Sequence, residues 1–136
     1  MYFLIYRSEA VNPMPEETLK LLLAQSRERN KTMDITGMLL YFDKKFLQLL
    51  EGDEKEVKRL YADICADNRH RNVYTLKEGP AENRLFPGWS MSFRLVSNED
   101  IAKEPAYKDI YKPGSAGASD LVSLFNLLRG KSDPTL

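Results

Sequence analysis

The sequence has little of what disulfides, metal sites and nucleic-acid interfaces need: one cysteine, one histidine and no excess charge of either sign. The lone Cys65 excludes an intramolecular disulfide, and the lone His70 excludes a metal site built from several histidines. Lysine plus arginine total 20, as do aspartate plus glutamate, so neither nucleic acid nor an anionic membrane is an expected partner. This balance also gives little self-repulsion, which favours a homo-oligomer.

Long apolar runs are missing as well. No segment approaches the roughly 20 apolar residues that span a bilayer, and the apolar start, residues 2–6, is too short for a signal peptide. A cytoplasmic location is expected, where a lone thiol stays reduced. We interpret Cys65 as a small core residue rather than a nucleophile. A chain of 136 residues is expected to form one domain.

Apolar runs separated by turn residues predict an α+β fold in the order βαββαββ. Strands are predicted over residues 2–6, 35–42, 46–51, 73–77 and 89–96. One helix is predicted from Pro15 to near Asn30, and a second follows the cap residue Asp53. This is the order of a ferredoxin-like sheet with one added strand. In such a sheet two helices cover one face, and the first and third strands are the central pair.

The other face of this sheet also needs a cover, because its central strands are apolar on both sides. Residues 119–129 supply one, since their apolar side chains recur at helical spacing behind the cap residue Ser119. We therefore expect residues 1–96 to form the sheet domain and residues 97–136 to form a C-terminal helical extension of the same domain.

A polar side chain interrupts one central strand, because Gln48 lies inside the apolar run Phe46–Leu50. An unpaired buried amide costs about 1–3 kcal/mol, so a polar partner must meet it inside the fold. Tyr6 lies on the matching face of the first strand. The two side chains are expected to meet across the central strands, either in an internal hydrogen bond or as part of a ligand site.

Other polar candidates lie near the ends of the predicted helices. Asn30 closes the first helix, where asparagine often serves as a cap. Asp67, Arg69 and His70 end the second helix, where they fit either a solvated terminus or a site. The sequence contains no glycine-rich phosphate loop and no nucleophile elbow, so these side chains do not belong to a common catalytic motif.

Five short motifs, taken in order, closely resemble those of the BLUF family, the blue-light sensors that use flavin. They are Tyr6-Arg7-Ser8, Asn30 with Asp34-Ile35-Thr36-Gly37, Phe46–Gly52, Asp67-Asn68-Arg69-His70 and Phe86–Met91. The resemblance covers roughly residues 1–96, which would then be a flavin-binding domain. Residues 97–136 look like the extension of short stand-alone members.

The resemblance implies a photoreceptor that holds FAD non-covalently between the two helices. It implies that Tyr6 is the light-driven electron and proton donor, and that Gln48 is the switch residue between Tyr6 and the flavin ring. Trp89 and Met91 match positions linked to the output of the signal. The positions implied to bind the cofactor are Ser8, Leu22, Arg29, Asn30, Ile64, Asp67, Arg69 and His70.

Within that set the resemblance assigns different parts of FAD to different residues. Asn30 matches the residue at the carbonyl edge of the ring, and Leu22 and Ile64 match the pair that sandwiches it. The three residues after the second helix match positions near the ribityl and phosphate end. Two positions depart from the family pattern: Arg29 stands at the flavin rim where some relatives carry asparagine or histidine, and Asp63 stands where some relatives place an arginine towards the phosphates. Phosphate binding is therefore expected to depend on Arg69 or on Arg29, or else the FAD tail is loosely held.

The chain is expected not to be an enzyme and to signal to a separate effector, because no catalytic domain follows residue 136. Two rival functions stay open. An acylphosphatase-like hydrolase needs an arginine beside a phosphate-cradling loop, and Arg7 stands roughly there, although the predicted loop Ser8–Pro15 has no glycine. A non-photoactive module that binds a ligand or a protein is equally compatible with the fold.

Overall fold

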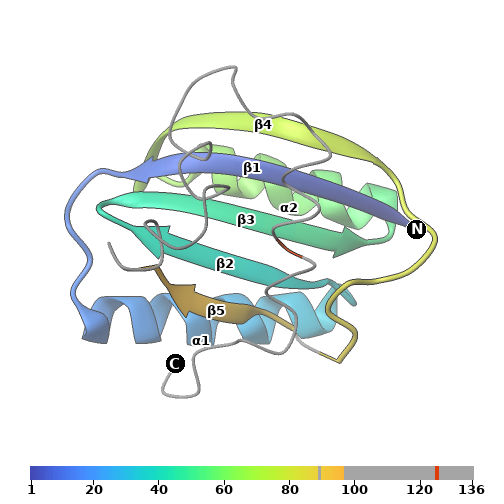
Figure 1. Ribbon diagram of the computed structural model, residues 1–136, viewed down its shortest axis with the longest axis horizontal. Coiled ribbons are helices and arrows are strands. Elements are labelled where there is room, and N and C mark those ends of the chain that lie inside the picture. Colours follow the sequence, from blue (N-terminus) through green and yellow to red (C-terminus); the bar gives the residue numbers. More distant parts are fainter. Residues whose placement is uncertain (89, 97–124, 126–136) are drawn as a thin grey trace.

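The computed structural model describes residues 1–88, 90–96 and 125. Five strands form one mixed sheet in the order β4-β1-β3-β2-β5, and two helices lie behind it in Figure 1. The elements are β1 (Tyr2–Ala10), α1 (Glu16–Thr32), β2 (Thr36–Phe42), β3 (Lys45–Gly52), α2 (Glu54–Ala66), β4 (His70–Pro80) and β5 (Ser92–Leu95). The predicted ferredoxin-like order is confirmed, because β1 and β3 are adjacent antiparallel strands and β5 is added beside β2, parallel to it.

The central strands are apolar on both faces because both faces are covered. Alternate side chains of β1 and β3, such as Leu4 and Leu50, pack in one core with the buried faces of α1 and α2. Their neighbours, such as Ile5 and Leu49, point away from the helices and belong to a second core. The prediction that the second face also needs a cover is thereby confirmed.

Phe125 belongs to this second core. It is helical and buried, and its ring meets the ring of Phe86 edge-on at a centroid distance of 6.5 Å. The rest of the predicted helix 119–129 lies outside the described residues, as does the rest of the extension 97–136. The division of the chain at residue 96 therefore stays a prediction.

Helix α1 begins as predicted and ends later than predicted. Pro15 is its N-cap, as expected for a residue whose fixed backbone angle suits a helix start. The helix runs past Asn30 to Thr32, so Asn30 is not its closing residue. Asn30 is instead fully buried, and its carbonyl oxygen accepts the backbone N–H of Ile35 at 2.9 Å.

Helix α2 is capped as predicted by Asp53, whose carboxylate accepts the backbone N–H of Lys55 at 3.1 Å. The prediction that Cys65 is a core residue is wrong, because its side chain is exposed. Cys65 follows the buried Ile64 directly, and successive helical residues point about 100° apart. No helix in the described part of the chain is long and apolar enough to cross a membrane.

Several strand ends differ from the predicted ones. Strand β1 continues to Ala10, so Arg7 and Ser8 lie inside a strand and not beside a loop. Strand β4 begins at His70, which therefore starts a strand and does not end the second helix. Strand β5 is shorter than predicted, and Met91 immediately precedes it. Trp89 lies outside the described residues.

Gly37 on β2 leaves no room for a side chain. A Cβ atom at this position would lie 1.9 Å from the carbonyl oxygen of Leu49 on β3. We expect Gly37→Ala to lower the free energy of unfolding by about 1–3 kcal/mol, because the strands must move apart. Urea unfolding measures this. Gly79→Ala is the matched control, since its nearest atom lies at 3.9 Å. Equal losses in both variants would contradict the explanation.

Candidate functional site

A cleft opens between α1 and α2 above the central strands. Its floor includes Tyr6 of β1 and Gln48 of β3, and apolar walls are supplied by Leu22 of α1 and Ile64 of α2. The cavity volume of this cleft is about 70 Å³, which is smaller than the roughly 300–1,000 Å³ of typical ligand pockets.

A chain of buried hydrogen bonds runs beneath this cleft. The Tyr6 hydroxyl donates to Gln48 Oε1, and Gln48 Nε2 donates to Met91 Sδ at 3.2 Å. Tyr6 and Gln48 are register partners on adjacent strands, so the predicted meeting of these two side chains is confirmed. The two ends of the amide are held unequally, because a thioether sulfur is a weak acceptor.

The Tyr6 hydroxyl keeps its proton at neutral pH. Burial raises the pKa of Tyr6 far above its usual value, and the positive charge of Arg29 opposes this only in part. A protonated phenol can donate or accept a hydrogen bond, and here the Tyr6 hydroxyl donates to Gln48 Oε1. This bond defines the resting orientation of the Gln48 side chain.

Two side chains of helix α1 donate hydrogen bonds to the backbone at and next to Met91. Asn30 Nδ2 donates to the carbonyl oxygen of Ser90 at 2.7 Å, and Arg27 Nε donates to that of Met91 at 2.8 Å. These two bonds place Met91 next to Gln48, and the thioether is fully buried. Asn30 therefore contacts the segment before β5 and is not among the side chains that line the cleft.

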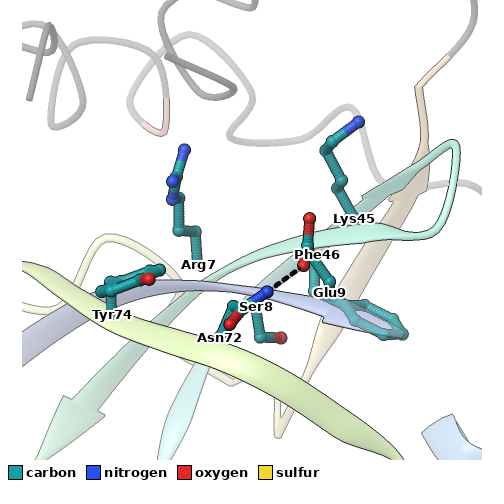
Figure 2. A pocket seen from close by; sticks show the side chains of 7 residues that line it. All are labelled: Arg7, Ser8, Glu9, Lys45, Phe46, Asn72 and Tyr74. Atoms are coloured by element: carbon teal, nitrogen blue, oxygen red, sulfur yellow. Dashed lines mark hydrogen bonds between the residues drawn. The ribbon is translucent and has the colours of Figure 1, made fainter. Parts of the chain in front are cut away.

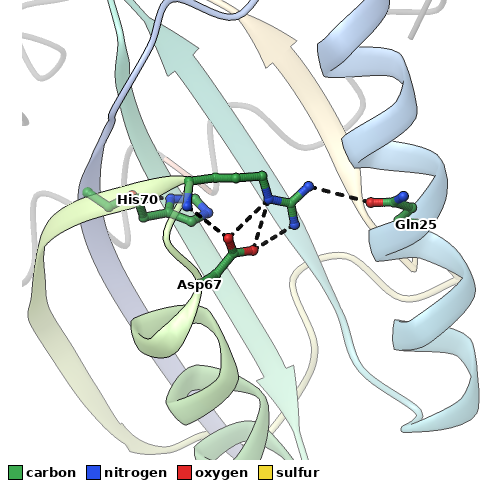
Figure 3. Close-up of polar contacts among 5 residues, drawn as sticks. Gln25, Asp67 and His70 are labelled. Atoms are coloured by element: carbon green, nitrogen blue, oxygen red, sulfur yellow. Dashed lines mark hydrogen bonds and ion pairs between the residues drawn. The ribbon is translucent and has the colours of Figure 1, made fainter.

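Charged side chains bridge the mouth of the cleft (Figure 3). Arg69 Nη2 contacts Asp67 Oδ2 at 2.6 Å, and Arg69 Nη1 donates to Gln25 Oε1 of α1 at 3.5 Å. Hydrogen bonding from Arg69 lowers the pKa of Asp67 to about 2, so this carboxylate is charged at neutral pH. The group formed by Asp67 and Arg69 thus extends from the end of α2 to α1.

His70 lies at the same end of the cleft and is partly buried. Its Nδ1 is 3.0 Å from Ser8 Oγ, and its ring packs on Phe46 at a centroid distance of 5.1 Å. Burial lowers the pKa of His70 below the usual 6.5. His70 lines the cleft. Ser8 is buried, contacts His70 and is not among the residues that line the cleft.

The lowered pKa of His70 predicts a pH dependence of stability. The unfolded chain binds a proton at His70 near pH 6.5, and the folded chain does so only at lower pH. The stability contributed by neutral His70 is therefore present above pH 6.5 and is lost as the pH falls. We expect the free energy of unfolding to decrease between about pH 7 and about pH 5, a window above the titration of Asp67.

Urea unfolding of the native chain and of His70→Gln at both pH values measures this dependence. The variant should lose part of the pH dependence, because glutamine does not titrate. An identical slope in the two proteins would show that other groups cause it.

The rival hydrolase finds no support in the second polar pocket, which lies around Arg7 and Lys45 (Figure 2). Arg7 lies within β1, where its guanidinium stands over the Tyr74 ring at 5.4 Å. The strand's own pairing with β3 and β4 uses backbone groups that a phosphate-cradling loop would need to present. Glu9 also lines the pocket, and its negative charge disfavours a phosphate. Among the described residues no cluster suited to a metal ion occurs.

Comparison with known proteins identifies the family. A family model described as sensors of blue light using FAD, the BLUF model, matches residues 1–92. The chain belongs to the BLUF family. FAD is therefore the cofactor of this BLUF domain.

The curated relatives of this BLUF domain are longer proteins of different kinds. The blue light- and temperature-regulated antirepressor BluF of Escherichia coli (strain K12) is 37% identical over 101 residues, which are 72% of this chain and 25% of that protein. A photoactivated adenylate cyclase subunit beta of Euglena longa is 33% identical over 108 residues, 79% of this chain and 12% of that protein. The chain thus spans a quarter or less of the length of these curated relatives.

A solved BLUF structure has the same fold. The dark-state structure of BlrB, a BLUF protein, matches with a TM-score of 0.79 and 30% sequence identity. The match covers 96% of this chain and 96% of that chain. The sheet and helices described above are therefore those of the BLUF fold.

The residues of the cleft fit a flavin nucleotide. Apolar Leu22 and Ile64 line the cleft from the two helices, which suits a flat aromatic ring, and Arg29 and Arg69 also line it and suit a phosphate-bearing tail. Arg29 lines the cleft, and its buried Nε atom has no hydrogen-bond partner in the described part of the chain. Unpaired buried polar atoms are rare and costly, and a polar group bound in the cleft would supply this partner.

The sequence prediction missed four side chains that line the cleft, Gln25, Ser26, Leu39 and Phe46. The helical spacing contains the signal for the first two. Leu22, Ser26 and Arg29 recur at intervals of four and three residues, and Gln25 completes the same face of α1.

Proposed function

We propose that this BLUF domain is a blue-light photoreceptor that binds FAD in the cleft between α1 and α2 and signals through the Gln48 amide. The observation that carries the proposal is the series of buried hydrogen bonds from the Tyr6 hydroxyl through Gln48 to Met91. These hydrogen bonds join the floor of the cleft to the segment that leads into β5. An amide at its centre can exchange donor and acceptor ends without leaving its place.

Bound FAD, held between Leu22 and Ile64, would supply the absorption of blue light and an electron acceptor. Tyr6 would serve as the electron donor, and its hydroxyl proton would move along the hydrogen bond to Gln48 Oε1. Return of the electron and the proton would restore Tyr6 to a neutral phenol, so no atom is gained or lost. The Gln48 amide is left rotated or in its tautomeric form, and this rearrangement is the stored signal.

The rearranged amide acts on Met91. In the resting arrangement Gln48 Nε2 donates to the sulfur atom. A rotated amide turns its oxygen toward that sulfur, and two acceptors without a proton between them repel each other. Met91 then loses its hydrogen-bond donor. The change is passed to the backbone of residues 90 and 91 next to β5, which Asn30 and Arg27 hold by hydrogen bonds.

The output is proposed to leave through β5 and the C-terminal extension to a separate effector protein. The similarity to a blue light-regulated antirepressor and to a photoactivated adenylate cyclase subunit suggests that one kind of sensor serves different outputs. We infer that this chain itself is a sensor and not an enzyme, that it acts in the cytoplasm, and that it is a dimer or a higher homo-oligomer. Light scattering at micromolar concentration tests the last point, and a strict monomer would contradict it.

The visible absorption spectrum before and just after blue illumination tests the function. We expect a flavin spectrum that shifts slightly to the red and recovers in the dark. A flavin spectrum that bleaches would mean different photochemistry and a different role for Gln48. Bound flavin without any response to light would favour the non-photoactive binding module.

A further inference from the structure

A buried carboxylate lies three residues beyond Gln48 on the same strand. Glu51 is 2% exposed and points to the face away from the helices. Its Oε1 atom accepts the backbone N–H of Phe86 at 2.8 Å, and its Oε2 atom accepts that of Leu85 at 2.8 Å. The Thr36 hydroxyl also donates to Oε1, at 2.9 Å. Glu51 thus ties two consecutive amides of a distant loop to the end of β3.

Arg84 fastens the same loop a second time. Its Nη1 atom donates to Thr36 Oγ1 at 2.8 Å and to the Glu51 carbonyl oxygen at 3.1 Å. Its Nη2 atom donates to the Asp34 carbonyl oxygen at 2.9 Å. We call Glu51, Arg84 and Thr36 the anchor. Residues 84–86 are therefore fixed to the ends of β2 and β3.

The segment from residue 84 to Met91 is consequently held at both ends and from both sides of the sheet. The anchor holds its start on the far face, and Asn30 and Arg27 hold its end on the helix face. Gly88, between the two, has a φ angle of +84°, which glycine adopts without strain. Any displacement of Met91 from Gln48 must therefore be taken up between these two attachments.

Burying a carboxylate is costly, and an apolar side chain of similar volume often stabilises a protein as well or better. Stability alone therefore does not explain Glu51. Its contacts with the two backbone amides fix the position of Leu85 and Phe86. A fixed position is what a switch needs if its parts are to return to the same resting arrangement. We propose that Glu51 is a positioning residue of the light switch: by fixing Leu85 and Phe86 it directs Met91 back to Gln48 and so sets the rate of dark recovery.

The inference rests on the proposed function, and Glu51→Gln in the full-length, FAD-loaded protein tests it. Glutamine has the same shape, but its NH₂ group must face one of the two N–H donors, so one amide loses its acceptor. We expect FAD and the red shift to be kept and dark recovery to slow by about tenfold, the effect of losing one hydrogen bond to a charged group.

A second readout does not depend on the light response. The methyl group of Met91, observed by NMR in the dark with and without FAD, should broaden or shift in Glu51→Gln, because the segment loses one attachment. If the native chain shows no red shift, the proposed function fails. The Met91 signal still decides whether the anchor positions this residue.

Two controls separate positioning from stability. Glu28→Gln makes the same chemical change at an exposed site on α1 and should leave recovery unchanged. Leu60→Ala destabilises the core beneath α2, on the opposite face of the sheet from the anchor, and should also recover at the native rate. If Leu60→Ala slows recovery as much as Glu51→Gln, or if Glu51→Gln has native recovery and a native Met91 signal, the inference is overturned.

Arg84→Lys serves if Glu51→Gln does not fold. It keeps the positive charge but loses the forked contacts to Thr36 and Asp34, so it loosens the same segment while leaving Glu51 in place. Slower recovery and a changed Met91 signal are again expected. Native values of both would contradict the proposal.

Discussion

Gln48→Leu is expected to abolish the light-induced red shift while FAD stays bound. Leucine has nearly the same volume, and the neighbouring strand positions are apolar, so the fold should survive. The change removes both the acceptor of the Tyr6 hydroxyl and the donor to Met91. No amide is then left to store the rearrangement. Absorption spectra recorded in the dark and after illumination measure the result.

The matched control for this prediction is Gln25→Leu. Gln25 lines the same cleft, but it lies at the rim beside Arg69 and takes no part in the chain of Tyr6, Gln48 and Met91. The same substitution there should leave the red shift in place. A full shift with native recovery in Gln48→Leu would show that another group is the switch.

Tyr6→Phe is expected to retain FAD and to block the normal photocycle. Phenylalanine fills the same buried site but has no hydroxyl proton and is a much poorer electron donor. It also leaves Gln48 Oε1 without its donor, which removes the force that fixes the resting amide. The red shift should therefore be absent at every illumination time, as measured by the same spectra.

Tyr61→Phe controls for the loss of a nearby hydroxyl. The Tyr61 ring lies 5.4 Å from that of Tyr6, but its hydroxyl contacts Thr75 and not Gln48. Removing it should leave the red shift unchanged. A normal photocycle in Tyr6→Phe would exclude Tyr6 as the donor, and a photocycle lost equally in both variants would point to packing rather than to proton transfer.

Local sequence patterns were sufficient to predict the sheet and the meeting of Tyr6 with Gln48. Apolar alternation placed Tyr6 and Gln48 on matching faces, and the order of the elements placed their strands side by side. The same reasoning could have placed Cys65 correctly, because it lies off the apolar face that contains Ile64. Propensity could not reveal that α1 passes Asn30, since tertiary packing buries that residue.

The contacts made by the segment before β5 could not be predicted from the sequence. The bond from Gln48 to Met91 joins residues 43 positions apart, and the bond from Asn30 to Ser90 joins residues 60 apart. Such contacts depend on the path of an irregular segment, which has no periodicity to read. The burial of Glu51 could not be predicted either, because a glutamate at the end of a strand is usually solvated.

The position of β5 has a consequence for how the protein folds. β5 pairs only four residues with β2, in parallel, and β3, α2 and β4 lie between these two strands in the sequence. Closing such a long loop is entropically costly until the intervening elements are in place. The hairpin β2–β3 and its pairing with β1 can form earlier, so Tyr6 and Gln48 meet before Met91 arrives. We therefore expect the light switch to be completed in the last step of folding.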